Sequence, residues 1–157
     1  MPLDRCAIKI LITNQTTIQM NIHLSFHELN WLAITVAALS AFGLGGLWYS
    51  PVLFVKIWMK ETGITEESSK DANMVKIFSL SFLLAMLAAI LLGLFLGEDS
   101  GGGVGALSGF LIGLGTIFTF LGITYLFERR TLAHFLVNAS YGVAALTLMG
   151  FIIGVWQ

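Results

Sequence analysis

Charged residues are scarce in this chain of 157 residues. They form only 11% of the sequence, whereas soluble domains contain about a quarter. Hydrophobic residues form 57%, and the formal net charge at pH 7 is −1. A nearly neutral chain offers no basic surface to nucleic acid. We therefore expect no nucleic-acid partner, and the length suits one compact membrane domain.

Cysteine is almost absent as well, since Cys6 is the single one. This excludes an internal disulfide framework and a cysteine-based metal site. His23 and His27 are four residues apart, but no third ligand lies near them, so we interpret them as interfacial histidines. No activated nucleophile, carboxylate pair or metal cluster stands out. The sequence therefore predicts no enzyme activity, no cofactor and no metal.

The first long apolar block, residues 29–54, defines the architecture. It contains no charged residue from Trp31 to Leu47, which suits the roughly 20 apolar residues that cross a bilayer core. Trp31 stands at one edge of the block, and Trp48 and Tyr49 stand at the other. Amphipathic rings at both edges are typical of the two membrane interfaces. The block is therefore predicted to be a transmembrane helix, with the lipid bilayer as its partner.

Local signals set the ends of this helix, and further apolar blocks follow it. A capping box from Ser25 to Glu28 predicts a start near Phe26, and Pro51 ends the helix because it lacks an N–H. Residues 1–24 form a tail that is disordered, a short strand or an interfacial segment, and Met20 is an alternative start. The sequence predicts an all-α, integral membrane four-helix bundle in residues 25–157, with helices at about 26–50, 74–96, 104–127 and 132–156.

Two connections have a recognisable composition. The segment after Pro51 is amphipathic, with Lys56 and Lys60 on one side, and Gly63 is a natural helix stop. Thr65 is predicted to cap a helix that runs on into the second apolar block. Residues 97–103 are predicted to form a polar turn. We exclude a phosphate loop there, because no Lys-Ser/Thr pair follows the glycines and two acids would repel phosphate.

Small residues recur every four positions in two of the predicted helices. Such stripes let helix backbones approach closely in a membrane. They are predicted to pack helices together, either inside one chain or between copies of it. The predicted packing residues are Ala37, Ala41, Gly45, Gly105, Gly109 and Gly113.

Lysine and arginine are unevenly divided between the loops. The first loop with its flanks carries four lysines, and the third carries Arg129 and Arg130, whereas the second carries none. The positive-inside rule then places the first and third loops in the cytoplasm and both termini outside. We expect a location in the bacterial cytoplasmic membrane.

The polar residues of the last helix suggest one candidate site. His134, Asn138 and Tyr141 share a face, since they are spaced i, i+4, i+7, and an amide at the depth of Asn138 needs partners in hydrocarbon. A charged turn lies above them. The candidate ligand pocket comprises Trp48, Tyr49, Ser50, Glu128, Arg129, Arg130, His134, Asn138 and Tyr141.

Several short motifs resemble one known family. They are Asn30-Trp31-Leu32-Ala33, Leu47-Trp48-Tyr49-Ser50-Pro51 with Leu53-Phe54, Lys56, Trp58-Met59, the turn Phe127-Glu128-Arg129-Arg130, and Asn138 with Tyr141. Together they resemble the membrane-protein family catalogued as domain of unknown function 1761, over about residues 29–156. The resemblance implies a four-helix integral membrane protein and no particular activity.

Two hypotheses about function follow. In the first, the polar side chains hold helices together, and the protein is a structural or accessory component of a homo-oligomer or a larger membrane complex. In the second, the protein binds or transports a small molecule or a lipid through the polar pocket on the cytoplasmic side. A dry, tightly packed core favours the first hypothesis, and a cavity that reaches Asn138 favours the second.

Overall fold

The structure, a computed structural model, describes residues 29–65, 67, 72–96 and 100–156. In this part of the chain every regular element is helical, which confirms the predicted all-α class. The elements are α2 (Trp31–Trp48), α3 (Val55–Thr62), α5 (Met74–Phe95), α6 (Gly101–Gly113), the π-helical turn η1 (Leu114–Phe118), α7 (Thr119–Phe127) and α8 (Leu132–Trp156).

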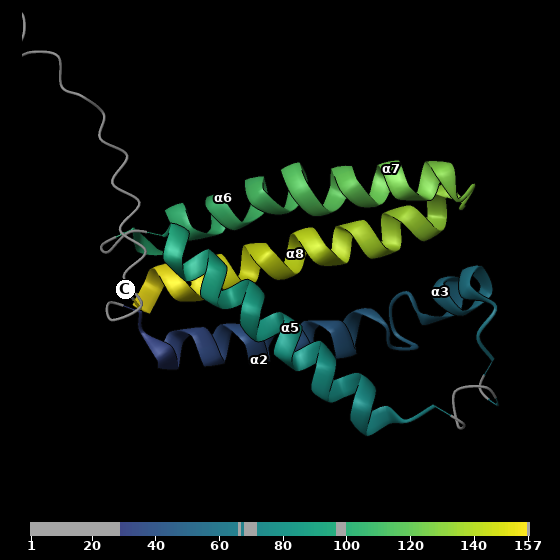
Figure 1. Cartoon of the computed structure of the whole chain (residues 1–157), viewed down its shortest axis with the longest axis horizontal. Helices are drawn as coiled ribbons and strands as arrows, with labels where there is room; N and C mark the ends of the chain where they lie inside the picture. Colours follow the sequence, from purple (N-terminus) through teal and green to yellow (C-terminus); the bar gives the residue numbers. More distant parts are fainter. Residues whose placement is uncertain (1–28, 66, 68–71, 97–99, 157) are drawn as a thin grey trace, which may run out of the picture.

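Within these described residues, four helices are long and apolar enough to cross a membrane, as predicted. They are α2, α5, the continuous helix Gly101–Phe127 and α8. Their chain ends gather at two ends of the molecule (Figure 1). One end holds α3 and the α7–α8 turn, and we call it the α3 end. The start of α2 and the end of α8 lie at the opposite end.

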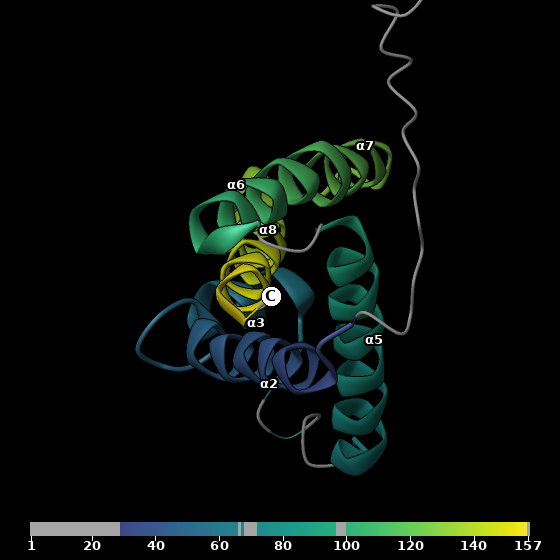
Figure 2. The same ribbon diagram turned by 90° about the vertical axis from the view of Figure 1, so that its left-hand side faces the viewer.

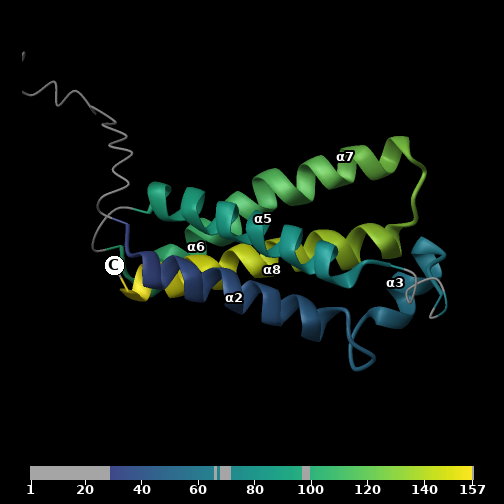
Figure 3. The same ribbon diagram turned by 60° about the horizontal axis from the view of Figure 1, so that its bottom comes forward.

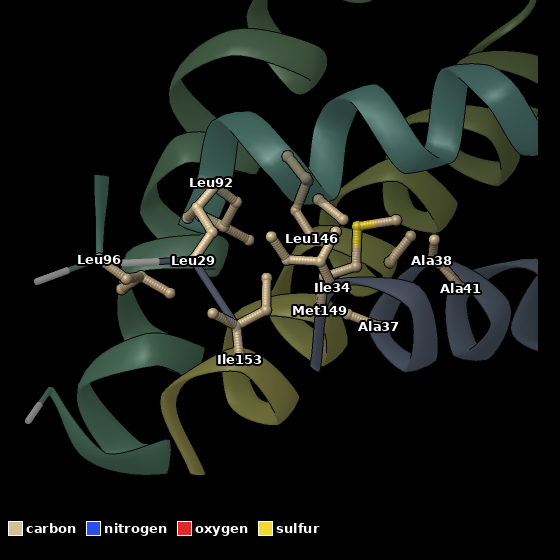
Figure 4. Close-up of a cluster of buried hydrophobic side chains, with 12 residues drawn as sticks. Leu29, Ile34, Ala37, Ala38, Ala41, Leu92, Leu96, Leu146, Met149 and Ile153 are labelled. Atoms are coloured by element: carbon tan, nitrogen blue, oxygen red, sulfur yellow. The ribbon is translucent and has the colours of Figure 1, made fainter. Parts of the chain in front are cut away.

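Helix α8 lies in the middle of the bundle. Seen from one end, α6 covers one side of it, while α2 and α5 cover others (Figure 2). Half of its apolar span is buried, against at most 28% for the other three. Ile34, Leu92, Met149 and Ile153 form the centre of a core shared by α2, α5 and α8 (Figure 4). The last helix therefore organises the packing of the whole domain.

The glycine stripe of α6 lies against α8. A Cβ atom added to Gly105 would overlap the carbonyl oxygen of Gly150, and one added to Gly109 would overlap that of Leu146. Gly113 also lies close to the backbone of α8, with 2.9 Å from its Cβ position to the Cα of Val143. Backbone meets backbone here, so only glycine fits this interface.

The second stripe also lies inside the chain. Ala37 and Ala41 of α2 are buried in the core. A Cβ on Gly45 would lie 2.9 Å from the hydroxyl of Tyr141, so this glycine makes room for the ring. Both predicted stripes are therefore used between helices of one chain.

The first helix starts later than the predicted position near Phe26. Leu29 and Asn30 are not helical, and α2 begins at Trp31. The side-chain oxygen of Asn30 accepts a hydrogen bond from the Ala33 amide at 3.1 Å, which makes Asn30 the N-cap. The Asn30 amide also donates to the carbonyl of Trp156 at 2.9 Å. The predicted capping box and the tail 1–24 lie outside the described residues.

Two further boundaries differ from the prediction. Helix α5 does not continue from the segment after Thr65, because Asn73 is a new N-cap that accepts from the Lys76 amide at 3.0 Å. The glycines at 101–103 belong to α6 rather than to a polar turn. Gly102 packs against the end of α8, since a Cβ there would lie 2.5 Å from a methyl group of Val155.

The long helix Gly101–Phe127 leaves α8 after its π-helical turn. Helix α6 packs closely along α8, whereas α7 lies further from it (Figure 3). A π-turn inserts one residue into the helical ladder and is a common cause of such a change in direction. Among the described residues this opens a groove between α7 and α8.

The short helix α3 closes the α3 end. It ends at Gly63, whose φ of 73° confirms the predicted helix stop. The hydroxyl of Thr131 donates to the carboxylate of Glu61, and the same hydroxyl accepts from the His134 amide at 3.1 Å, which caps α8. One threonine thus joins α3 to the start of α8.

Candidate functional site

Asn138 of α8 is the centre of a hydrogen-bonded network. Its side-chain oxygen accepts from the Tyr49 hydroxyl at 3.0 Å, and its side-chain nitrogen donates to the Tyr125 hydroxyl at 2.9 Å. Tyr49 follows the last residue of α2, and Tyr125 lies in α7. The amide therefore joins three helices, and both its oxygen and its nitrogen have a partner.

Two more polar side chains bond across the same region. The indole N–H of Trp48 donates to the carbonyl of Val137 at 3.0 Å, and the Tyr141 hydroxyl donates to the carbonyl of Ala41 at 3.3 Å. The rings of Tyr49 and Tyr141 meet edge to face, with centroids 5.4 Å apart. Aromatic rings and satisfied polar groups fill the space around Asn138.

The hydroxyl of Tyr49 is held in its neutral form. Burial, and then the neighbouring phenols of Tyr141 and Tyr125, raise its pKa from 10.0 to about 12. At neutral pH it is therefore a hydrogen-bond donor, as the bond to Asn138 requires.

His134 is the most buried polar side chain of the predicted pocket, with 6% of its surface exposed. Its ring lies against that of Tyr125, with centroids 5.0 Å apart. Its Nδ1 has no hydrogen-bond partner among the described residues. Within that same part of the chain, no three His, Cys, Asp or Glu side chains gather as metal ligands would.

The charged residues of the predicted pocket lie apart from this network. Glu128 and Arg130 pair with each other at 3.0 Å and are about half exposed. Arg129 has a φ of 54°, which places it at the tip of the turn. Ser50 accepts a bond from the Val52 amide and shapes the turn after α2. The structure thus divides the predicted pocket into an inner network and an outer turn.

Sequence reasoning did not assign two aromatic residues to this region. Tyr125 completes the bonding of Asn138, and Trp58 of α3 meets Tyr49 edge to face, with centroids 5.8 Å apart. The signal for Tyr125 was its position as the single tyrosine of residues 101–127. A phenol in an apolar helix needs a polar partner.

Apolar grooves lie beside the network. A groove of about 490 Å³ between α2 and α5 is lined by Gly46, Tyr49, Ser81 and Tyr141 among other residues. A groove of about 670 Å³ lies between α7 and α8, and a third of about 830 Å³ lies between α2, α6 and α8. Asn138 itself does not line these three grooves.

Comparison with known proteins gives one result. Curated proteins and solved structures include no match to this chain. The family described as "Protein of unknown function (DUF1761)" matches residues 32–154, which includes all four long helices except their outermost residues. The chain therefore belongs to this family of unknown function.

Proposed function

We propose that the protein is a non-enzymatic, four-span integral membrane protein with a structural or accessory role in a membrane assembly. The observation that carries this proposal is the bonding of Asn138. Its amide joins Tyr49 and Tyr125 instead of facing an open cavity. Interhelical hydrogen bonds of this kind stabilise bundles in lipid, where an unpaired amide is costly.

The proposed orientation places the α3 end in the cytoplasm and both termini outside. Lys56, Lys60, Arg129 and Arg130 are exposed, and α3 lies at the same end as the α7–α8 turn (Figure 1). Lys70 lies outside the described residues. Basic residues near helix ends favour the cytoplasmic side. The expected location is the bacterial cytoplasmic membrane.

The proposed partner is a second copy or another membrane protein, and it must use a surface other than the two small-residue stripes. Gly105 and Gly109 are already in contact with α8. The first half of α5 is a surface that remains open, because Val75 is 78% and Phe78 55% exposed.

The groove between α2 and α5 supports a second candidate function, binding of an apolar molecule with one hydrogen-bonding group. Tyr49 and Tyr141 both line it, and each donates its own proton elsewhere. Their oxygens therefore keep a lone pair for a donor on a ligand. Ser81 adds a hydroxyl to the same groove.

Native mass spectrometry of the protein released gently from its membrane separates the two functions. Gly46 lines the groove and a Cβ there meets no atom within 4 Å, so we expect Gly46→Leu to occupy the groove. Gly43→Leu is the matched control, because Gly43 also faces open space but does not line the groove. We expect a stable assembly with identical bound molecules in wild type and both variants.

A bound molecule that is present in wild type and Gly43→Leu but lost in Gly46→Leu would contradict the accessory role. It would identify the class of ligand for the second candidate. A bare monomer in all three samples would contradict the proposed assembly.

A further inference from the structure

The groove between α7 and α8 has apolar walls and a basic residue where it meets the turn. Phe118, Ile123, Leu126 and Phe135 line it, together with Arg130 and Thr131. Gly122 also lines the groove, and its missing side chain leaves room beside the ring of Phe135. The groove has a volume of about 670 Å³, and its lining offers apolar side chains to an acyl chain and one basic side chain to an anion.

Arg130 has donors available for such an anion. Its Nε binds Glu128 at 3.0 Å, and its two terminal nitrogens have no partner among the described residues. The guanidinium group prefers planar, multiple contacts with phosphate oxygens. Thr131 also lines the groove, but its hydroxyl donates to the carboxylate of Glu61, so the donors for an anion come from Arg130 alone.

The surroundings of the turn place it at the boundary between hydrocarbon and headgroups. Leu126 is 80%, Phe127 87% and Leu132 70% exposed, directly beside the two arginines. In the proposed membrane placement these apolar side chains face lipid, and the arginines reach the phosphate level. An acyl chain in the groove would then bring a lipid phosphate to Arg130.

We infer that the α7–α8 groove binds one anionic phospholipid, with its phosphate on the terminal nitrogens of Arg130 and one acyl chain along Gly122 and Phe135. This site rests on the proposed membrane placement, but it does not depend on the accessory role. The groove borders the Asn138 network at Tyr125, which lines it, and the lipid leaves the bond between Asn138 and Tyr125 intact.

The test uses native mass spectrometry of the whole protein with equal amounts of dioleoyl phosphatidylglycerol and dioleoyl phosphatidylcholine. Wild type is expected to retain one phosphatidylglycerol, with about a tenfold preference over phosphatidylcholine, as one charge-assisted contact would give. Arg130→Gln is expected to lose this preference. Arg129→Gln is the matched control, because it removes the same charge from the same turn outside the groove lining, and it should keep the preference.

A second pair of variants tests the acyl chain. Gly122→Leu fills the groove and should reduce retention of both lipids, whereas Gly103→Leu, at a glycine of α6 that faces open space, should not. If Gly122→Leu fails to fold, competition on wild type decides: glycerol 3-phosphate and inorganic phosphate carry the anion without the chain and should not displace the lipid.

Several results would overturn the site. An equal loss of the preference for phosphatidylglycerol in Arg130→Gln and Arg129→Gln would mean that the lipid is attracted diffusely to basic residues. Displacement of the lipid by inorganic phosphate would mean that the site binds an ion and not a lipid. Unchanged lipid retention in folded Gly122→Leu would mean that the acyl chain does not lie in the groove. A dimer that Gly122→Leu dissociates would assign the groove to a second copy. Loss of the lipid with an unchanged assembly would leave the accessory role unaffected.

Discussion

Replacing Gly109 with alanine is expected to lower the free energy of unfolding by about 3 kcal/mol, the upper end of the usual range for overpacking. The reason is geometric. The new methyl group would overlap the carbonyl oxygen of Leu146, and a backbone atom cannot turn aside as a flexible side chain can. Helices α6 and α8 would have to separate along their whole contact. Reversible unfolding in mixed micelles measures the loss.

Gly103→Ala is the matched control for this prediction. Gly103 lies on the same helix, but a Cβ there meets no atom within 4 Å. Alanine favours helix over glycine by roughly 1 kcal/mol, so this variant should be as stable as wild type or slightly more stable. Equal stability of Gly109→Ala and Gly103→Ala would show that the two backbones do not touch at Gly109.

Replacing Asn138 with leucine is expected to lower the free energy of unfolding by about 1–3 kcal/mol, because two phenols lose their partner at once. Tyr49 loses its acceptor and Tyr125 loses its donor. Leucine has a similar volume, so little of the effect should come from a cavity.

A double-mutant cycle isolates the bond itself. Asn138→Leu combined with Tyr49→Phe should give a coupling energy of roughly 0.6–1.7 kcal/mol, between the average and the largest value measured for hydrogen bonds between membrane helices. Asn138→Leu with Thr147→Val is the control pair, because the Thr147 hydroxyl bonds within α8 to the Val143 carbonyl. A coupling near zero for the Tyr49 pair would mean that Asn138 does not tie α2 to α8.

Much of the architecture could be predicted from composition and local signals. The four long apolar helices follow from hydropathy alone, and Gly63 ends α3 because glycine adopts a positive φ easily. The start of α2 was missed because two capping signals lie close together. Asn30 caps the helix that the structure shows, through its bond to Ala33.

The remaining features depend on contacts between distant parts of the chain. The glycines at 101–103 have the composition of a turn, but they begin α6, and Gly101 and Gly102 lie against α8, which is far along the sequence. The same is true of Tyr125. Its bond to Asn138 requires α7 and α8 to be paired, and the π-turn after Gly113 that redirects α7 has no local signature in the sequence.

The proposed membrane placement puts the α3 end in the cytoplasm, and labelling of single cysteines in intact cells tests this claim most directly. Cys6 is the native reporter for the terminus. Lys60→Cys in a Cys6→Ser background reports on α3, where Lys60 is exposed. The account predicts that a membrane-impermeant maleimide labels Cys6 in intact cells and labels the α3 cysteine only after lysis. Labelling of the α3 cysteine in intact cells, with Cys6 protected, would contradict it.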